Sequence, residues 1–184
     1  MGKTILNIKA KLSEKGIVNT NISFLGNPEF DKILSIMQKE SDQAVVIVGH
    51  SFLEELLDRL MKKRLFGEKA IPRITFDKKV SFCYSIGVLT DYDKRDLERI
   101  NKIRNNFAHR FNEIDFNSEI IASICKKFEF FNTINKGMIE STTFSNRQKC
   151  ESEIAYLFMS LQIKLALIPP IEKCSIPNNF NDPA

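Results

Sequence analysis

The sequence predicts an all-α fold, a compact bundle of five to six helices. Glycine and proline are scarce, with 7 and 6 residues in a chain of 184, whereas sandwiches and barrels need turn residues at short, regular intervals. Apolar residues recur at spacings of three and four along most of the chain, which is the pattern of helices with one buried face. Such helices, joined by short loops, pack into a bundle.

The chain is long enough for one domain with its own core. We expect an N-terminal extension over 1–27, partly helical around 5–15, then a helical domain over 28–168, and a loose tail over 169–184. Gly-Asn-Pro, ending at Pro28, marks the first boundary, and the Pro-Pro pair that begins at Pro169 marks the second.

The first part of the domain predicts two helices. Apolar residues follow Pro28 with helical spacing and predict about three turns. Ser41 is a good N-cap for a second helix over 44–60. Its first half is apolar on every side, which predicts burial all round. Its second half is amphipathic, with these residues facing inward: Phe52, Leu53, Leu56, Leu57 and Leu60.

Two helices are predicted in the middle of the chain. A short one over 78–86 ends at Gly87, a plausible residue to follow a helix C-terminus. Thr90 or Asp91 then caps a long charged helix that reaches residue 111. The apolar stripe of this helix consists of Leu97, Ile100, Ile103, Phe107, Ala108 and Phe111.

The C-terminal part of the domain predicts two more helices. Asn117 or Ser118 opens one that continues through 131, and the last helix covers 147–167. The phenylalanines of the first have two interpretations, a core position or a helix–helix dimer face, of which the core is favoured. They are Phe128, Phe130 and Phe131.

Composition excludes several classes of protein. The sequence has no apolar run of about 18 residues for a membrane span and no secretory signal. Its net charge of +4 is too small for a protein that coats DNA. The four cysteines lack the spacing of a zinc site or of a disulfide framework. We therefore expect a cytoplasmic protein without metal or cofactor; its cysteines are Cys83, Cys125, Cys150 and Cys174.

A basic stretch covers 62–79. One interpretation is a cationic helix C-terminus that complements the helix dipole, followed by a solvated loop. The other is a patch that contacts nucleic-acid phosphates, although no helix-turn-helix with a basic recognition helix accompanies it. The candidate nucleic-acid-binding residues are Lys62, Lys63, Arg64, Lys69 and Arg73, with Lys78 and Lys79 completing the stretch.

The most distinctive chemistry lies in the hexapeptide 104–109, Arg-Asn-Asn-Phe-Ala-His. Asparagine is a poor residue inside a helix, so two in a row suggest a local role beyond helix stability. Arg104 and His109 differ by about 140° around the helix axis and about 7.5 Å along it. One helix therefore does not bring them together, whereas a second copy packed antiparallel would place both pairs in one cleft.

Such a cleft suits cleavage of a phosphodiester without metal. His109 would act as general acid or base, Arg104 would hold the phosphate, and Asn105 would orient the imidazole or bind a phosphate oxygen. The alternative is structural: Asn105 and His109 form a polar pair, and Arg104 bridges to an acid on a neighbouring helix. His50, with Glu54 four residues later, indicates a structural hydrogen bond.

The hexapeptide resembles the Arg-polar-His pattern of the HEPN superfamily of helical domains. The wider sequence resembles one branch, the mannitol operon repressor (MltR) family, over roughly 30–168. Supporting segments are 40–42, 51–57 and 93–103. Gln43 stands where that branch is expected to carry a basic residue, and His50 where a small one is usual.

This resemblance implies two functions. The mannitol repressor branch implies a transcriptional regulator without a DNA-binding motif, which acts as a homodimer or through a partner such as a transcription factor. The wider superfamily implies a metal-independent endoribonuclease, a toxin or defence component with an antitoxin partner. It would cut RNA with Arg104, Asn105 and His109 across a dimer interface.

Overall fold

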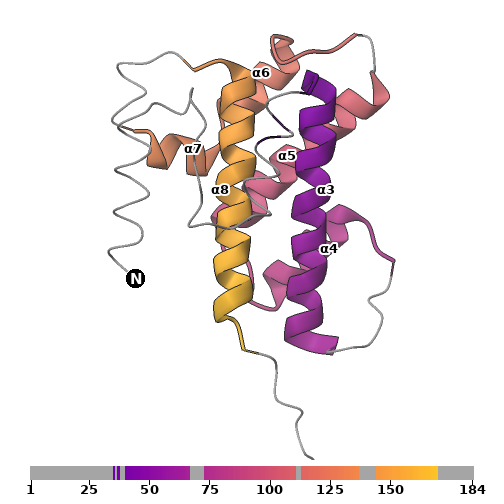
Figure 1. The fold of residues 1–184 in the computed structure, drawn as a ribbon, viewed down its shortest axis with the longest axis vertical. Coiled ribbons are helices and arrows are strands. Elements are labelled where there is room, and N and C mark those ends of the chain that lie inside the picture. Colours follow the sequence, from indigo (N-terminus) through magenta and orange to yellow (C-terminus); the bar gives the residue numbers. More distant parts are fainter. Residues whose placement is uncertain are drawn as a thin grey trace, which may run out of the picture.

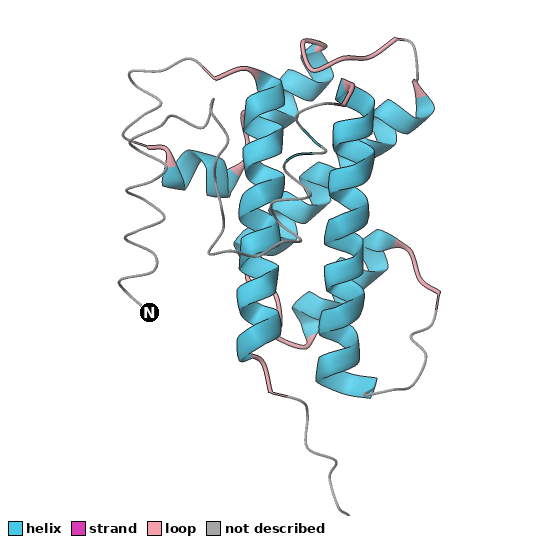
Figure 2. Ribbon diagram, in the orientation of Figure 1, coloured by secondary structure: helices cyan, strands magenta, loops and turns pink. Residues whose placement is uncertain are grey.

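The computed structural model describes residues 35, 37, 40–66, 73–110, 113–136 and 144–169. Over these residues the chain is helical and has no strand, which confirms the predicted all-α class (Figures 1 and 2). Six α-helices lie wholly within the described residues: α3 (Asp42–Met61), α4 (Phe76–Ser85), α5 (Asp91–His109), α6 (Glu119–Cys125), α7 (Glu129–Ile134) and α8 (Asn146–Leu167). A π-helical turn, η1 (Lys62–Phe66), continues α3. None of the described helices is long and apolar enough to cross a membrane.

Several sequence predictions lie outside the described residues. They include the helix around 5–15, most of the helix after Pro28, and the tail beyond Pro169. Within the predicted helix after Pro28, Met37 is helical and buried.

The two longest helices, α3 and α8, lie side by side and begin at the same end of the molecule (Figure 1). Helix α5 crosses behind them and packs against both, and α4 packs on α3 and α5. The core lies where α3, α5 and α8 meet. It includes Leu53, Leu57, Leu97, Ile100, Ile103, Leu157 and Leu161, all with 0% exposure.

Local capping fixes where the helices begin. Ser41 accepts a hydrogen bond from the Ala44 amide, as predicted for an N-cap. Thr90 forms a capping box with Asp93, and Ser145 forms one with the residue three positions later. These bonds satisfy amides that a helix N-terminus leaves without intrahelical partners. At the end of α4, Gly87 has φ +72°, the left-handed conformation predicted for this position.

Two predicted burial patterns are wrong in part. The apolar first half of α3 is not buried all round, because Ile47 is 38% exposed. Similarly, Ala108 ends the buried stripe of α5 in an exposed position, while Phe107 before it is buried. Residue 111 lies outside the described chain.

The single helix predicted over 118–131 is two helices, α6 and α7. Helix α6 ends at Cys125 and α7 begins at Glu129. The carboxylate of Asp96 on α5 accepts hydrogen bonds from the amides of Glu129 and Phe130. A cap supplied by another helix thus competes with continuation of α6. Phe128 and Phe131 are both 0% exposed and Phe130 is partly buried, so the core interpretation is confirmed.

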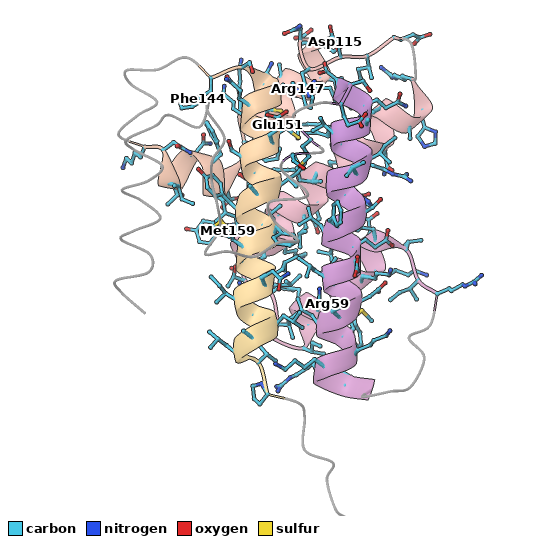
Figure 3. The ribbon with its side chains drawn as sticks, in the orientation of Figure 1. Arg59, Asp115, Phe144, Arg147, Glu151 and Met159 are labelled. Carbon is cyan, nitrogen blue, oxygen red and sulfur yellow. The ribbon has the colours of Figure 1, made fainter. Side chains whose placement is uncertain are left out.

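A network of hydrogen bonds at the start of α3 joins residues 37–42 to the first turns of α8. Figure 3 shows Arg147 and Glu151 on α8 beside the first turn of α3. The guanidinium of Arg147 contacts Asp42 Oδ1 at 2.7 Å and Glu151 Oε1 at 2.8 Å. It also donates to the backbone oxygens of Met37 and Glu40. Arg147 therefore ties α8 to the chain that enters α3.

Candidate functional site

The hexapeptide 104–109 forms the last turns of α5, and all six residues are helical. The first turn of α5 is anchored elsewhere, because the Asp93 carboxylate accepts from Ser160 Oγ at 2.7 Å and lies 3.0 Å from Lys164 Nζ on α8. Along the helix, the buried stripe holds one face against the core. The backbone of the C-terminal turns of α5 is therefore held in place, and the side chains outside the buried stripe extend from it.

Arg104 is half-buried, next to the stripe as predicted. Its Nη1 donates to Asn105 Oδ1 at 3.1 Å. The acidic partner that a purely structural role predicts for Arg104 is not found among the residues that the structure describes. A guanidinium has five N–H donors, so most of them remain for another group.

His109 is the last residue of α5 and is exposed. The predicted polar pair of Asn105 with His109 does not form in the described chain, because Asn105 accepts from Arg104 instead. The structure thus brings the side chains of Arg104 and Asn105 into contact, whereas His109 lies exposed at the C-terminus of α5. No hydrogen bond between Arg104 and His109 is found within the described chain.

Asn106, the second asparagine of the motif, has a local explanation. Its Nδ2 donates to the backbone oxygen of Lys102, one turn earlier, at 2.8 Å. Such a bond back to the preceding turn lets a polar residue sit inside a helix. Asn106 therefore has a structural role within α5.

A polar chain that the sequence did not predict lies one turn before the hexapeptide, with His50 and Asn101 buried and Asp77 exposed. Asn101 Oδ1 is 3.0 Å from His50 Nε2, and Asn101 Nδ2 donates to Asp77 Oδ1 at 2.7 Å. The chain links α3, α5 and α4. One signal was present in the sequence: Asn101 follows Leu97 by four positions, which places an amide on the buried face and requires a partner there.

This polar chain fixes the form of the His50 imidazole. Asp77 accepts from Asn101, so the amide oxygen of Asn101 faces His50, and Nε2 must carry the hydrogen. The ring centroid of His50 lies 4.1 Å from that of Phe76. Burial lowers the pKa of His50, and the positive charge of Arg104 lowers it further, against the raising effects of Asn101 and Glu54. His50 is therefore a neutral, structural histidine.

The structural role predicted for His50 is thus supported, but the predicted partner is wrong. Glu54 does not accept from His50; its carboxylate lies 2.9 Å from Lys79 Nζ, which also contacts Asp58 at 2.9 Å. Lys79 is only 7% exposed. The interpretation of the basic stretch as solvated is therefore wrong at Lys79, because two acids of α3 bind its ammonium group.

The described residues of the basic stretch lie in different environments, some bound to backbone oxygens and others exposed. Lys63 Nζ donates to the backbone oxygens of Leu165 and Ala166, and Arg64 Nη1 donates to that of Pro169 at 2.9 Å. The oxygens of Leu165 and Ala166 belong to the last turn of α8, where positive charge is favoured, and Pro169 follows that helix. Lys62 and Arg73 are exposed, and Lys69 lies outside the described residues.

The described residues contain no group of three or more His, Cys, Asp or Glu side chains that could hold a metal ion. Cys83, Cys125 and Cys150 are free, buried thiols. Burial raises the pKa of Cys83 and of Cys125 to about 12, so both are protonated and unreactive. Cys174 lies outside the described residues.

Comparison with known proteins gives one solved structure of similar fold. No protein-family model matches the sequence, and no curated protein matches it. The fold is similar to that of the MtlR chain in the X-ray structure of the MtlR–HPr complex from Escherichia coli, with a TM-score of 0.54 and 14% identity. The match covers 72% of this chain and 97% of that chain. At this identity the likeness shows a shared helical fold.

Proposed function

We propose that this chain is a regulatory protein that acts in transcriptional regulation by binding another protein, without reading DNA itself. The fold carries the proposal, because the similar MtlR chain was solved in complex with a protein, HPr. The resemblance of the hexapeptide and its flanking segments to the mannitol operon repressor family supports the same assignment from the sequence.

The division of the basic stretch also favours a protein partner over DNA. Lys63 binds a carbonyl in the last turn of α8, and Arg64 binds the carbonyl of Pro169 just after that helix. The exposed members Lys62 and Arg73 lie in η1 and in the loop before α4, respectively. Neither position is on a helix that could enter the major groove with several base-reading side chains.

The α3–α5 face is the surface that we assign to the partner. Gln43 Nε2 donates to the Phe107 oxygen, and His50 contacts Asn101, so α3 and α5 run antiparallel with Ile47 level with Arg104. Ile47 and Ala108 are exposed apolar residues on this face. An apolar centre with arginine beside it is the composition of many protein interfaces.

Titration calorimetry with purified HPr tests the proposal. The wild-type chain is expected to bind HPr, and Ile47→Lys is expected to weaken binding by at least about tenfold, or 1.4 kcal/mol. The matched control is Ile163→Lys, which changes an isoleucine of α8 that is 45% exposed and should leave affinity unchanged. Equal loss in both variants rejects the α3–α5 face. Absence of HPr binding, with unchanged transcript levels after deletion of the gene, overturns the regulatory proposal.

A second function, metal-independent endoribonuclease, is favoured by one observation. Arg104 has no acidic partner in the described chain, and the exposed His109 is free to meet a second copy. In a homodimer that pairs two α5 helices, Arg104 would hold the scissile phosphate of RNA and His109 would transfer the proton. Asn105 would keep the guanidinium in place.

Cleavage of single-stranded RNA in EDTA tests this second function. Arg104→Ala and His109→Ala should each abolish cleavage while the fold remains intact. Lys102→Ala is the control, because it removes an exposed cation from the same helix without touching the motif. If the wild-type protein cleaves nothing in a broad RNA panel, the ribonuclease function is rejected and the regulatory one is unaffected.

A further inference from the structure

Two buried carboxyl groups, far from the hexapeptide, hold the start of α7. Asp96 on α5 and Glu153 on α8 are both 0% exposed. Burying two acids side by side is costly unless each is hydrogen-bonded and their charges are compensated. The hydrogen bonds of Asp96 and Glu153 therefore determine whether both carboxyl groups can be buried.

The first three amides of α7 are divided between these acids. Asp96 Oδ2 accepts from the amides of Glu129 at 3.0 Å and Phe130 at 3.1 Å. Glu153 Oε2 accepts from the amide of Phe131 at 2.8 Å. These are amides that a helix N-terminus leaves without intrahelical partners.

The two acids are not equivalent. Asp96 also accepts from the guanidinium of Arg99, so a positive charge accompanies its negative one. Glu153 Oε1 is buried and receives no hydrogen bond from a donor in the described chain. The carboxyl groups of Asp96 and Glu153 accept from consecutive amides of α7 and therefore lie beside each other, where a hydrogen bond between them would satisfy Oε1. Two ionised carboxylates have no proton for such a bond, and their charges repel.

We propose that Glu153 is protonated in the folded protein, that its Oε1–H donates to Asp96, and that this shared proton latches α7 onto α5 and α8. Asp96 keeps the negative charge, because three amide and guanidinium groups already donate to it. The proposal concerns the conformation of the domain and does not depend on the function proposed above.

The surroundings of Glu153 agree with a neutral acid. Burial raises its pKa well above the ordinary 4.5, and the charge and hydrogen bond of Asp96 raise it further. The Phe131 amide and Arg99 oppose this to a smaller degree. The other titratable neighbours, Cys125 on α6 and Cys150 and Tyr156 on α8, also have raised pKa values and carry no charge.

The sign of the pH dependence follows from this raised pKa. The unfolded chain releases the proton of Glu153 near pH 4.5, whereas the folded chain retains it to a higher pH. The stabilisation by the shared proton is therefore fully present below pH 4.5. It declines as the pH rises above 4.5 and is lost above the pKa of the folded state. The latch holds α7 when protonated and loosens when the proton leaves.

Infrared spectroscopy of the full chain at pH 6 detects the proton directly. The wild-type protein is expected to show the C=O band of a buried protonated carboxylic acid. Glu153→Gln should abolish the band, and the exposed-site control Glu119→Gln should leave it. Absence of the band from the wild-type protein, or its persistence in Glu153→Gln, overturns the proposal.

Urea unfolding distinguishes the two acids. Glu153→Gln should match the wild-type midpoint below pH 4.5, because the glutamine amide donates to Asp96 in place of the acid. It should also lack the decline of the midpoint above pH 4.5. Asp96→Asn should lower the midpoint, because a neutral amide replaces the charged acceptor of α7 and Arg99. Equal losses in both variants would mean that both acids are ionised, contrary to the proposal.

Discussion

Gly49 on α3 lies against Ile154 on α8 so closely that a Cβ atom on the glycine would be 2.6 Å from Ile154 Cδ1. The same Cβ would lie 3.0 Å from Cγ2 and 3.3 Å from Cγ1 of Ile154. Glycine costs about 0.5–1 kcal/mol inside a helix relative to alanine. Here the cost is offset by the close approach of the two longest helices.

Gly49→Ala should therefore destabilise the protein. Three atoms of a buried isoleucine oppose the added methyl group, and overpacking of this kind costs about 1–3 kcal/mol, more than the gain in helix propensity. Urea unfolding measures the difference. Adding Ile154→Val removes the nearest atom, Cδ1, and should restore part of the loss. A Gly49→Ala variant as stable as the wild type would show that α3 and α8 separate easily.

His50 should titrate below the usual histidine pKa of 6.5, because burial opposes its charge. The chain has two histidines, so His109→Ala leaves His50 as the single imidazole for a titration by NMR. The unfolded chain takes up a proton near pH 6.5 while the folded chain does not. Stability should therefore fall as the pH drops below 6.5, and His50→Gln should lack this component. A His50 pKa at or above 6.5 contradicts the prediction.

Lys79→Met should cost about 2 kcal/mol, between the values for exposed and buried ion pairs, because it leaves the carboxylates of Glu54 and Asp58 facing each other. Chemical denaturation at neutral pH measures this. The control is Lys78→Met, an exposed neighbour on α4 that should change stability by less than about 0.5 kcal/mol. Burial lowers the pKa of Lys79, but its two carboxylate partners outweigh this and raise it above 10.5. The stabilisation is therefore present below pH 10.5 and declines as the pH rises toward and through the raised pKa.

Lys63→Ala should lower the free energy of unfolding by about 1 kcal/mol, because its ammonium group satisfies two carbonyls at the end of α8. Lys62→Ala removes an exposed lysine one position earlier and should have little effect. Thermal unfolding of the two variants compares them directly. Equal stability of both would assign Lys63 to the solvated surface with Lys62.

Local sequence signals predicted the helix termini well. Ser41, Thr90 and Gly87 act through bonds to residues a few positions away or through their own backbone conformation, so the sequence alone contains the relevant information. The buried stripe of α5 was predicted for a similar reason, since one periodic face makes it. Ala108 was the exception, because the period continues past the point where the neighbouring helices cover α5.

Interactions between distant residues could not be predicted in this way. His50 was assigned a partner four residues away, but Asn101 is 51 residues away. Lys79 was expected in solvent, because the sequence does not show that Glu54 and Asp58, on another helix, lie beside it. The break between α6 and α7 was hidden for the same reason: the apolar pattern continues through it, and the cap comes from Asp96. In the candidate site, periodicity placed Arg104 beside the core, but the sequence did not reveal that its hydrogen-bond partner is Asn105 rather than an acid.

The capping of α7 by side chains of α5 and α8 has a consequence for the order of folding. Helix α7 has 6 residues, whereas an isolated helix needs about 12–15 to be even marginally stable in water. Its initial amides depend on Asp96 and Glu153, which come together only when α5 and α8 have docked. Formation of α7 is therefore a late event, and the rate at which its amides gain protection during refolding measures the assembly of the two longer helices.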